Sequence, residues 1–171
     1  QFHAKSLPVI QVYGATETAP IAVYTTVDDA HGKIGSTGKS AIHCDIRLVD
    51  DDGKDVTQGA SGEIFVRGPS IMREYWKQPE VTRDVLDDQG WFKTGDMGHF
   101  DKDGYLYVDD RKKDMIISGG ENIYPAELEN VLAECTGLAE AAVVGRPDDK
   151  WGEVAVAVCV PKDGHEPKTE E

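Results

Sequence analysis

The sequence of 171 residues predicts an α+β protein with two parts. Residues 42–67 and 91–109 contain apolar segments of strand length between glycine-containing turns, which is typical of antiparallel hairpins. Residues 125–135 have the apolar spacing of an amphipathic helix, and two apolar runs of strand length follow it. The polar stretch Asp109–Lys113 separates these two patterns, so we expect a domain boundary there.

The first part is expected to consist mostly of β-structure. Asp50–Gly53 predicts a hairpin turn, because glycine adopts the positive φ that such turns require. A strand is expected at Glu63–Arg67, and a short helix at Pro79, because proline fits the first helical turn. A second hairpin is expected at Trp91–Asp109, with its turn at Asp101–Gly104.

The second part is expected to combine strands with one helix. A short strand is predicted at Met115–Ser118, and Pro125 opens the helix. The helix should place four apolar residues on one face: Leu128, Val131, Leu132 and Cys135. Further strands are predicted at Leu138–Gly145 and Val154–Val160, and Thr169 is expected to cap another helix.

Composition and charge exclude several classes of protein. With 18 Lys+Arg against 32 Asp+Glu, the net charge of −14 disfavours binding to nucleic acid. No apolar run approaches the roughly 18 residues of a membrane span, so no transmembrane segment is expected. Three distant cysteines and scattered histidines predict reduced thiols, a cytoplasmic location and no transition-metal site.

The stretch Gly32–Ser40 superficially resembles a phosphate-binding P-loop. That motif needs four residues between its first glycine and its Gly-Lys-Ser/Thr, whereas five separate Gly32 from Gly38. A P-loop also leads into a helix, but the residues that follow here predict a strand. We therefore interpret this stretch as a turn into the first hairpin.

The loop Tyr13–Glu17 contains residue types suited to a nucleotide. A threonine hydroxyl beside glycine can bind a phosphate oxygen, and a neighbouring carboxylate can hold a hard cation such as Mg²⁺. An aromatic ring offers a stacking face for a base. This segment taken alone favours the structural interpretation, a simple turn with Thr16 as a helix cap.

Three later segments also have a functional and a structural interpretation. Asp96 could accept hydrogen bonds from both ribose hydroxyls, or could simply occupy a turn. Arg111 could donate to a sugar or a phosphate, or belong to a solvated linker. The paired glycines in Ser118–Glu129 permit close approach of a ligand, or form a tight connection from strand to helix.

Taken together and in order, these segments resemble the AMP-forming acyl-CoA synthetases of the adenylate-forming superfamily. The resemblance rests on five motifs, in chain order: Tyr13-Gly-x-Thr-Glu17, Gly90-Trp-Phe-x-Thr-Gly-Asp96, Asp103-Gly-Tyr105, Arg111-x-Lys-Asp114 and Ser118-Gly-Gly-Glu-Asn-Ile-x-Pro-x-Glu-x-Glu129. It covers the chain from about Val12 to Val160. It implies a ligase that activates a fatty or aromatic acid with ATP and Mg²⁺, and then transfers the acyl group to coenzyme A.

The resemblance also implies roles for individual residues. Tyr13 would stack on adenine, Thr16 would bond the α-phosphate, and Glu17 would hold Mg²⁺, which makes Thr16 and Glu17 the catalytic pair. Gly14 would belong to the same AMP/ATP-binding site. Asp96 and Arg111 would bind the ribose hydroxyls. Lys113 would be the hinge residue, and the coenzyme A site would include Gly119 and Gly120.

Within this resemblance, residues 1–110 correspond to the β-rich end of a large AMP-binding domain, 111–113 to a hinge, and 114–171 to the first part of a small mobile domain. The family's upstream phosphate loop and its downstream catalytic lysine are missing, so we expect a fragment that is inactive by itself. Other interpretations are a non-catalytic adenylate-binding or interaction module, a luciferase-like enzyme and a peptide-synthetase adenylation domain. Homo-oligomer formation stays open.

Overall fold

Antiparallel sheets and two short α-helices make up the described part of the chain, which confirms the α+β prediction. The computed structural model describes residues 6–165. The chain divides between Val108 and Asp109 into two units, described separately below. Thr169, the expected cap of a further helix, lies outside the described residues.

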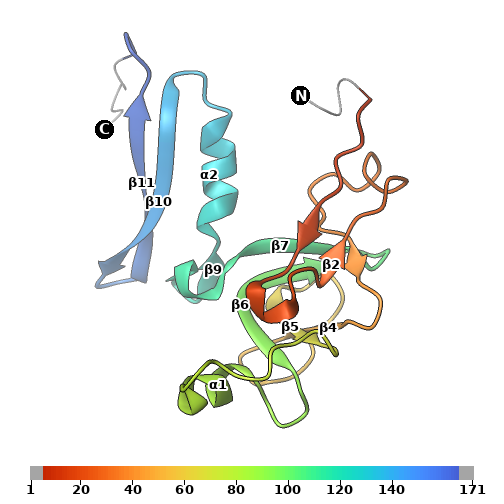
Figure 1. Cartoon of the computed structure of the whole chain (residues 1–171). Helices are drawn as coiled ribbons and strands as arrows, with labels where there is room; N and C mark the ends of the chain where they lie inside the picture. Colours follow the sequence, from red (N-terminus) through yellow and green to blue (C-terminus); the bar gives the residue numbers. More distant parts are fainter. Residues whose placement is uncertain (1–5, 166–171) are drawn as a thin grey trace. The chain divides into compact units, whose positions relative to one another are not determined.

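The first unit begins with a three-stranded antiparallel sheet in the order β1-β2-β3 (Figure 1). Its strands are β1 (Val12–Tyr13), β2 (Val23–Tyr24) and β3 (Lys39–Ser40). The 3₁₀ helix η2 (Thr16–Thr18) connects β1 to β2. The stretch Gly32–Ser40, which resembled a P-loop, ends in the strand β3, and the next element is again a strand and not a helix, as we expected for a turn into a hairpin.

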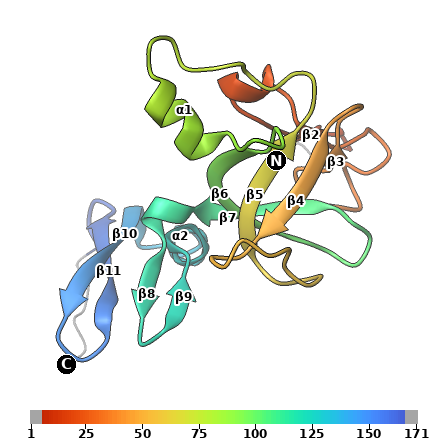
Figure 2. The same cartoon turned by 90° about the horizontal axis from the view of Figure 1, so that it is seen from below.

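A four-stranded sheet in the order β4-β5-β6-β7 forms the rest of this unit (Figure 2). Its strands are β4 (Asp45–Val49), β5 (Gly62–Arg67), β6 (Phe92–Phe100) and β7 (Leu106–Arg111), the last of which runs past the division at Val108. The alternation along β5 buries Ile64 and Val66, which pack in the core with Leu48, Leu106, Ala22 and Val23. The core thus supports β1 and β2 as well.

The predicted turns and the first helix are present, with one difference. Gly104 has φ +79° in the turn between β6 and β7, as expected. The turn at Asp50–Gly53 also forms, but β5 starts only at Gly62, so the connection is longer than a tight hairpin. The helix α1 (Pro79–Val85) begins at the predicted proline.

In the second unit, a sheet in the order β10-β11-β8-β9 is accompanied by one helix. Its elements are η3 (Lys112–Asp114), β8 (Ile116–Ser118), β9 (Glu121–Ile123), α2 (Pro125–Ala133), β10 (Leu138–Asp148) and β11 (Gly152–Pro161). The two long strands β10 and β11 lie beside each other and α2 lies along β10 (Figure 1). The predicted strands and helix are therefore present.

Two details of this unit differ from the expectation. The strand β9 was not predicted: Gly119 and Gly120, with φ of +61° and +90°, form a hairpin turn between β8 and β9 and not a connection from strand to helix. The helix ends at Ala133, so Cys135 lies beyond it and is exposed. Neither α-helix in residues 6–165 has the length and hydropathy required to span a bilayer.

Candidate functional site

The structure joins two of the predicted site residues by a direct hydrogen bond. The hydroxyl of Tyr13, on β1, donates to Oδ2 of Asp96, on β6, at 2.8 Å, although 83 positions separate them in the sequence. Tyr13 is partly buried and packs against the hydrophobic core, so its ring has a fixed position. A carboxylate has lone pairs on both oxygens, so Asp96 can accept further hydrogen bonds while it holds Tyr13.

A bulge in the sheet presents Asp96. Glu63 pairs with Met97 and Phe65 with Lys93, so three residues of β6 face a single residue of β5. Gly95 adopts φ +74° inside this bulge, a value that suits glycine. The Thr94 hydroxyl donates to the Ile64 carbonyl at 2.8 Å and accepts the Asp96 backbone N–H at 3.1 Å. The Thr-Gly-Asp sequence thus builds the bend and places the carboxylate.

The loop after Tyr13 is closely packed. A Cβ at Gly14 would lie 1.8 Å from the Pro20 carbonyl oxygen, so a side chain cannot fit there without a shift. The buried Thr18 hydroxyl accepts the Ala15 backbone N–H at 2.9 Å and donates to the Ala15 carbonyl at 3.0 Å. Thr16 is exposed on η2, where its hydroxyl is accessible to a ligand.

Glu17 has a partner that sequence reasoning missed. The hydroxyl of Tyr75 donates to Glu17 Oε1 at 2.7 Å, and both side chains are half-buried. This hydrogen bond to a carboxylate, together with burial, raises the pKa of Tyr75 to about 12. No group of three or more His, Cys, Asp or Glu residues within the described ranges is arranged to hold a metal ion. A cation bound to Glu17 would therefore also need oxygen ligands from a bound substrate.

The remaining predicted residues belong to the second unit. Arg111 is the last residue of β7, and its backbone N–H donates to Oδ1 of Asp110 at 2.7 Å. Lys113 is exposed on η3. Asp96 and Arg111, both expected at the ribose, thus lie on opposite sides of the division at Val108.

The turn that contains the two glycines is tied to β11. A Cβ at Gly119 would lie 2.7 Å from Cε3 of Trp151, and the Gly119 backbone N–H donates to the Trp151 carbonyl at 2.8 Å. A Cβ at Gly120 would meet no atom within 4 Å. Gly119 is therefore required by packing and backbone conformation, whereas Gly120 is required by its φ alone.

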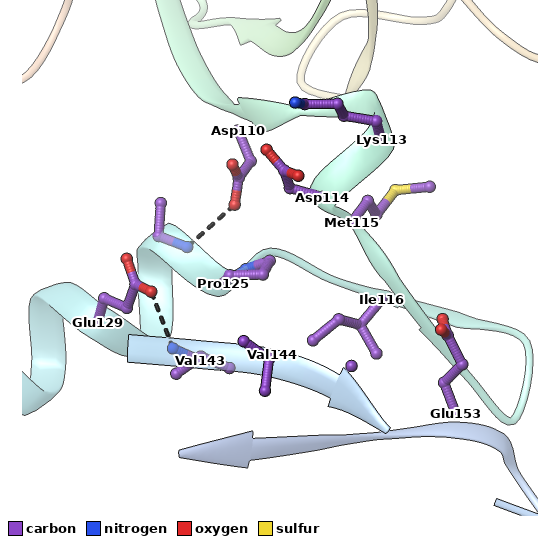
Figure 3. Close-up of a pocket in the computed structure, with 12 residues that line it drawn as sticks. Asp110, Lys113, Asp114, Met115, Ile116, Pro125, Glu129, Val143, Val144 and Glu153 are labelled. Atoms are coloured by element: carbon purple, nitrogen blue, oxygen red, sulfur yellow. Dashed lines mark hydrogen bonds between the residues drawn. The ribbon is translucent and has the colours of Figure 1, made fainter. Parts of the chain in front are cut away.

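A cavity of about 410 Å³ lies beside Lys113 in this unit (Figure 3). Its carboxylates mainly bind backbone groups: Asp110 Oδ2 accepts the Ala126 N–H at 3.0 Å, and Glu129 Oε1 accepts the Val143 N–H at 2.8 Å. Asp110 thereby caps the first turn of α2, whose own N-cap residue Tyr124 makes no side-chain cap. These carboxylates have a structural role.

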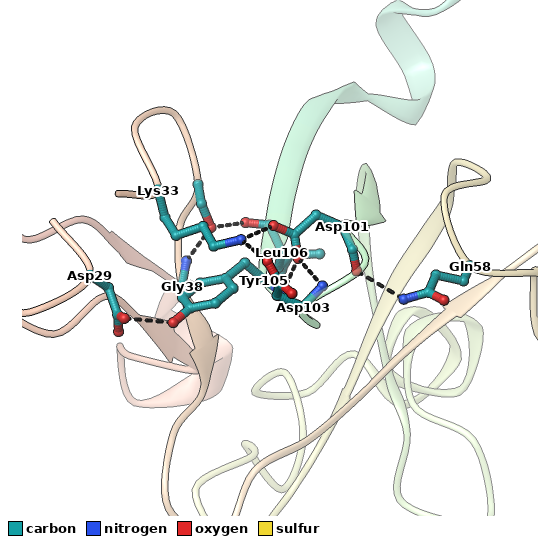
Figure 4. Close-up of polar contacts among 9 residues, drawn as sticks. Asp29, Lys33, Gly38, Gln58, Asp101, Asp103, Tyr105 and Leu106 are labelled. Carbon is teal, nitrogen blue, oxygen red and sulfur yellow. Dashed lines mark hydrogen bonds and ion pairs between the residues drawn. The ribbon is translucent and has the colours of Figure 1, made fainter. Parts of the chain in front are cut away.

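A second polar cluster lies in the first unit, at the turn between β6 and β7 (Figure 4). Lys33 Nζ lies 2.7 Å from Asp101 and 2.5 Å from Asp103. The Tyr105 hydroxyl donates to Asp29 Oδ1 at 2.5 Å, and the ammonium groups of Lys33 and Lys39 lie 4.6 and 4.4 Å from the Tyr105 ring centre. The glycine-rich stretch that resembled a P-loop thus uses its lysines to hold this turn.

Comparisons with known proteins identify the family of the chain. Residues 1–76 match the family model described as AMP-binding enzyme, and residues 127–171 match the AMP-binding enzyme C-terminal domain. The chain belongs to this family of adenylate-forming, AMP-binding enzymes, and the two matches fall in the first and second unit respectively.

Among its relatives are ligases of coenzyme A. The chain is 58% identical over 164 residues to the indoleacetate–CoA ligase of Aromatoleum aromaticum, covering 96% of this chain and 32% of that enzyme. It is 45% identical over 159 residues to a long-chain-fatty-acid–CoA ligase of Mycobacterium tuberculosis, covering 93% of this chain and 31% of that enzyme. The chain thus spans about a third of the length of the curated relatives it matches.

The fold of the chain is shared with part of a solved CoA synthetase. The o-succinylbenzoate CoA synthetase of Bacillus subtilis, in complex with its acyl-adenylate intermediate, has a TM-score of 0.88 and 42% sequence identity. The match covers 98% of this chain and 34% of that one. The similarity therefore extends over both units and all the elements that contain the candidate site.

Proposed function

We propose that this chain is part of an AMP-forming carboxylate–CoA ligase. In such an enzyme a carboxylate oxygen attacks the α-phosphorus of ATP, the bond to pyrophosphate breaks, and an acyl-adenylate forms. The sulfur of coenzyme A then attacks the acyl carbon, and AMP leaves. The observation that supports this proposal most directly is the Tyr13–Asp96 hydrogen bond, which brings two nucleotide-binding motifs together.

The first unit supplies groups suited to the adenosine half of the substrate. Asp96 is an acceptor only, so it can hold the ribose hydroxyls while Tyr13 fixes its orientation. The ring of Tyr13 provides a stacking face for adenine, and the exposed hydroxyl of Thr16 can donate to the α-phosphate. These groups bind and orient the nucleotide, which lowers the entropic cost of the reaction.

Mg²⁺ fits the chemistry of Glu17. A carboxylate is the hard oxygen ligand that Mg²⁺ prefers, and the ion usually takes only one or two protein carboxylates together with substrate phosphates. A bound Mg²⁺ would neutralise phosphate charge as the bond to pyrophosphate breaks.

In the second unit, we propose that Arg111 donates to the ribose, that Lys113 is a hinge and that Gly119 and Gly120 line the path of coenzyme A. Arg111 and Lys113 are exposed close to the division between the units, where a change of domain orientation needs flexible backbone. The acid is proposed to be aromatic or fatty, since relatives that act on indoleacetate and on long-chain fatty acids are both similar to this chain.

The proposal is tested by binding of AMP to this chain in titration calorimetry. Asp96→Ala should weaken binding at least tenfold, because the ribose hydroxyls lose their acceptor. Asp84→Ala, at an exposed position of α1, is the control and should leave the affinity unchanged. Equal affinity of the Asp96→Ala variant and the unaltered chain would refute the ribose role.

Catalysis is tested in a chimera in which this chain replaces the matching third of the indoleacetate–CoA ligase. We expect ATP–pyrophosphate exchange and CoA thioester formation in the chimera, and no exchange by the 171-residue chain alone. A chimera that folds and binds AMP but forms no adenylate with indoleacetate or a fatty acid would favour a non-catalytic adenylate-binding module.

A further inference from the structure

We infer that Tyr75 is a positioning residue for the carboxylate of Glu17, which it holds in one orientation for a divalent cation. The inference rests on the proposed function, because it assumes that Glu17 is the cation ligand. It assigns a role to a tyrosine 58 positions away from Glu17, in a segment that contains none of the nucleotide-binding motifs.

The hydrogen bond itself is short and directed at one oxygen. Tyr75 donates its hydroxyl to Glu17 Oε1 at 2.7 Å, and both side chains are half-buried, which limits competition from water. Within the described residues, Oε2 of Glu17 accepts no hydrogen bond, so this oxygen is available to a cation.

The backbone around both residues is also fixed. The Met72 backbone N–H donates to the Glu17 carbonyl at 2.8 Å, so the segment before α1 binds Glu17 twice. Tyr75 is in turn anchored to α1, because its backbone N–H donates to the Thr82 hydroxyl at 2.9 Å and its carbonyl accepts the Gln78 N–H at 3.0 Å. The backbone of Tyr75 is therefore held at the start of α1, independently of Glu17.

This arrangement has a consequence for cation binding. A glutamate side chain with free torsions loses conformational entropy when a metal fixes it, whereas Glu17 has already lost part of it in the hydrogen bond. Partners that orient a metal-ligating carboxylate typically contribute 10–100-fold to metal affinity. Removal of the Tyr75 hydroxyl should therefore lower the affinity for the cation, although the hydroxyl does not contact the cation.

The experiment follows Mn²⁺, a paramagnetic substitute for Mg²⁺, by NMR on this chain. Because a net charge of −14 attracts cations to the whole surface, the affinity is taken from local broadening of the amide signals of residues 16–18. We expect Glu17→Gln to abolish this broadening and Tyr75→Phe to raise the Mn²⁺ concentration for half-broadening about tenfold. Tyr105→Phe is the matched control, because it removes another tyrosine–carboxylate hydrogen bond of the first unit.

A second measurement needs no substitution. In the unaltered chain, the Cζ signal of Tyr75 should broaden in parallel with the Glu17 amide, whereas that of Tyr105 should not. Two results would refute the role of Tyr75 and leave Glu17 as the ligand, provided that Glu17→Gln removes the broadening. The first is that the Tyr75→Phe variant binds Mn²⁺ as tightly as the unaltered chain. The second is that the Tyr75 Cζ signal of the unaltered chain stays sharp. If Glu17→Gln has no effect, the cation role in the proposed function fails, and this inference with it.

Discussion

Lys33 and Asp101 illustrate how single residues fix the turn between β6 and β7. Burial alone raises the pKa of Asp101, but hydrogen bonds from Lys33 and from the backbone of Tyr105 and Asp103 outweigh it and lower the pKa from 3.8 to about 2. Because this pKa is lower in the folded chain than in the unfolded one, the carboxylate stabilises the fold above about pH 4, and the contribution is lost as the pH falls towards 2.

Asp101→Asn should therefore lower the melting temperature of the first unit most at neutral pH, with a difference from the unaltered chain that shrinks below pH 4. Circular dichroism melts from pH 7 to pH 2 measure this difference. Asp88→Asn, at an exposed position without such partners, should give no difference at either pH. A deficit for Asp101→Asn that stays constant over the whole range would show that its ionisation is irrelevant to stability.

At the level of residues, the sequence singled out candidate functional side chains, whose roles stay predictions, but it did not show how these side chains are held. Tyr13, Glu17 and Asp96 stood out by type and spacing. The hydrogen bonds that orient them span 83 and 58 positions, and no local pattern encodes such contacts. Tyr75 was missed for this reason: beside Trp76, it looked like any aromatic residue ahead of a helix.

The bulge in β6 provides a prediction about an element. Gly95 and Gly104 have φ of +74° and +79°, and a Cβ at either position would meet no atom within 4 Å. Substitution by alanine should cost about 1 kcal/mol at each, from backbone strain alone. Only Gly95→Ala should also lower the affinity for AMP, by several-fold, because it shifts the bulge that presents Asp96.

Paired measurements distinguish the two effects. Denaturant unfolding should show equal losses of stability for both variants, and calorimetry should show weaker AMP binding for Gly95→Ala alone. If Gly104→Ala lowers the affinity for AMP by the same factor, general destabilisation accounts for the loss of AMP binding. Unchanged affinity for Gly95→Ala would mean that the bulge does not position Asp96.

Elements with strong local signals were predicted well. Pro79 and Pro125 open their helices, and Gly104 forms its turn, because the conformation of these residues is restricted whatever surrounds them. The strand β9 was missed because Glu121–Ile123 has no apolar alternation. It is a strand because the adjacent glycine turn brings it beside β8, with which it pairs. The β6 bulge was missed because it depends on the register between two strands.

The division of the chain between Val108 and Asp109 separates the predicted nucleotide-binding residues into two groups. Tyr13, Glu17 and Asp96 lie in the first unit, whereas Arg111 and Lys113 follow the division. The polar stretch at 109–113 suggested a boundary from sequence, but the role of Lys113 as a hinge stays a prediction. A change of orientation at a hinge would depend on small differences in free energy between conformations, which no local sequence pattern encodes.

The two units should unfold separately. Among the described residues, the buried hydrophobic side chains lie almost entirely before residue 109, and the second unit contributes only Ile116 and Val143. Its apolar surface is largely open, with Val131 at 66% and Val158 at 56% exposure, so hydrophobic burial stabilises it less. In a urea titration followed by NMR, we expect the native amide signal of Val143 to disappear at lower urea than that of Ile64. Coincident loss of the two signals would instead show one cooperative unit, because both cores would then depend on each other.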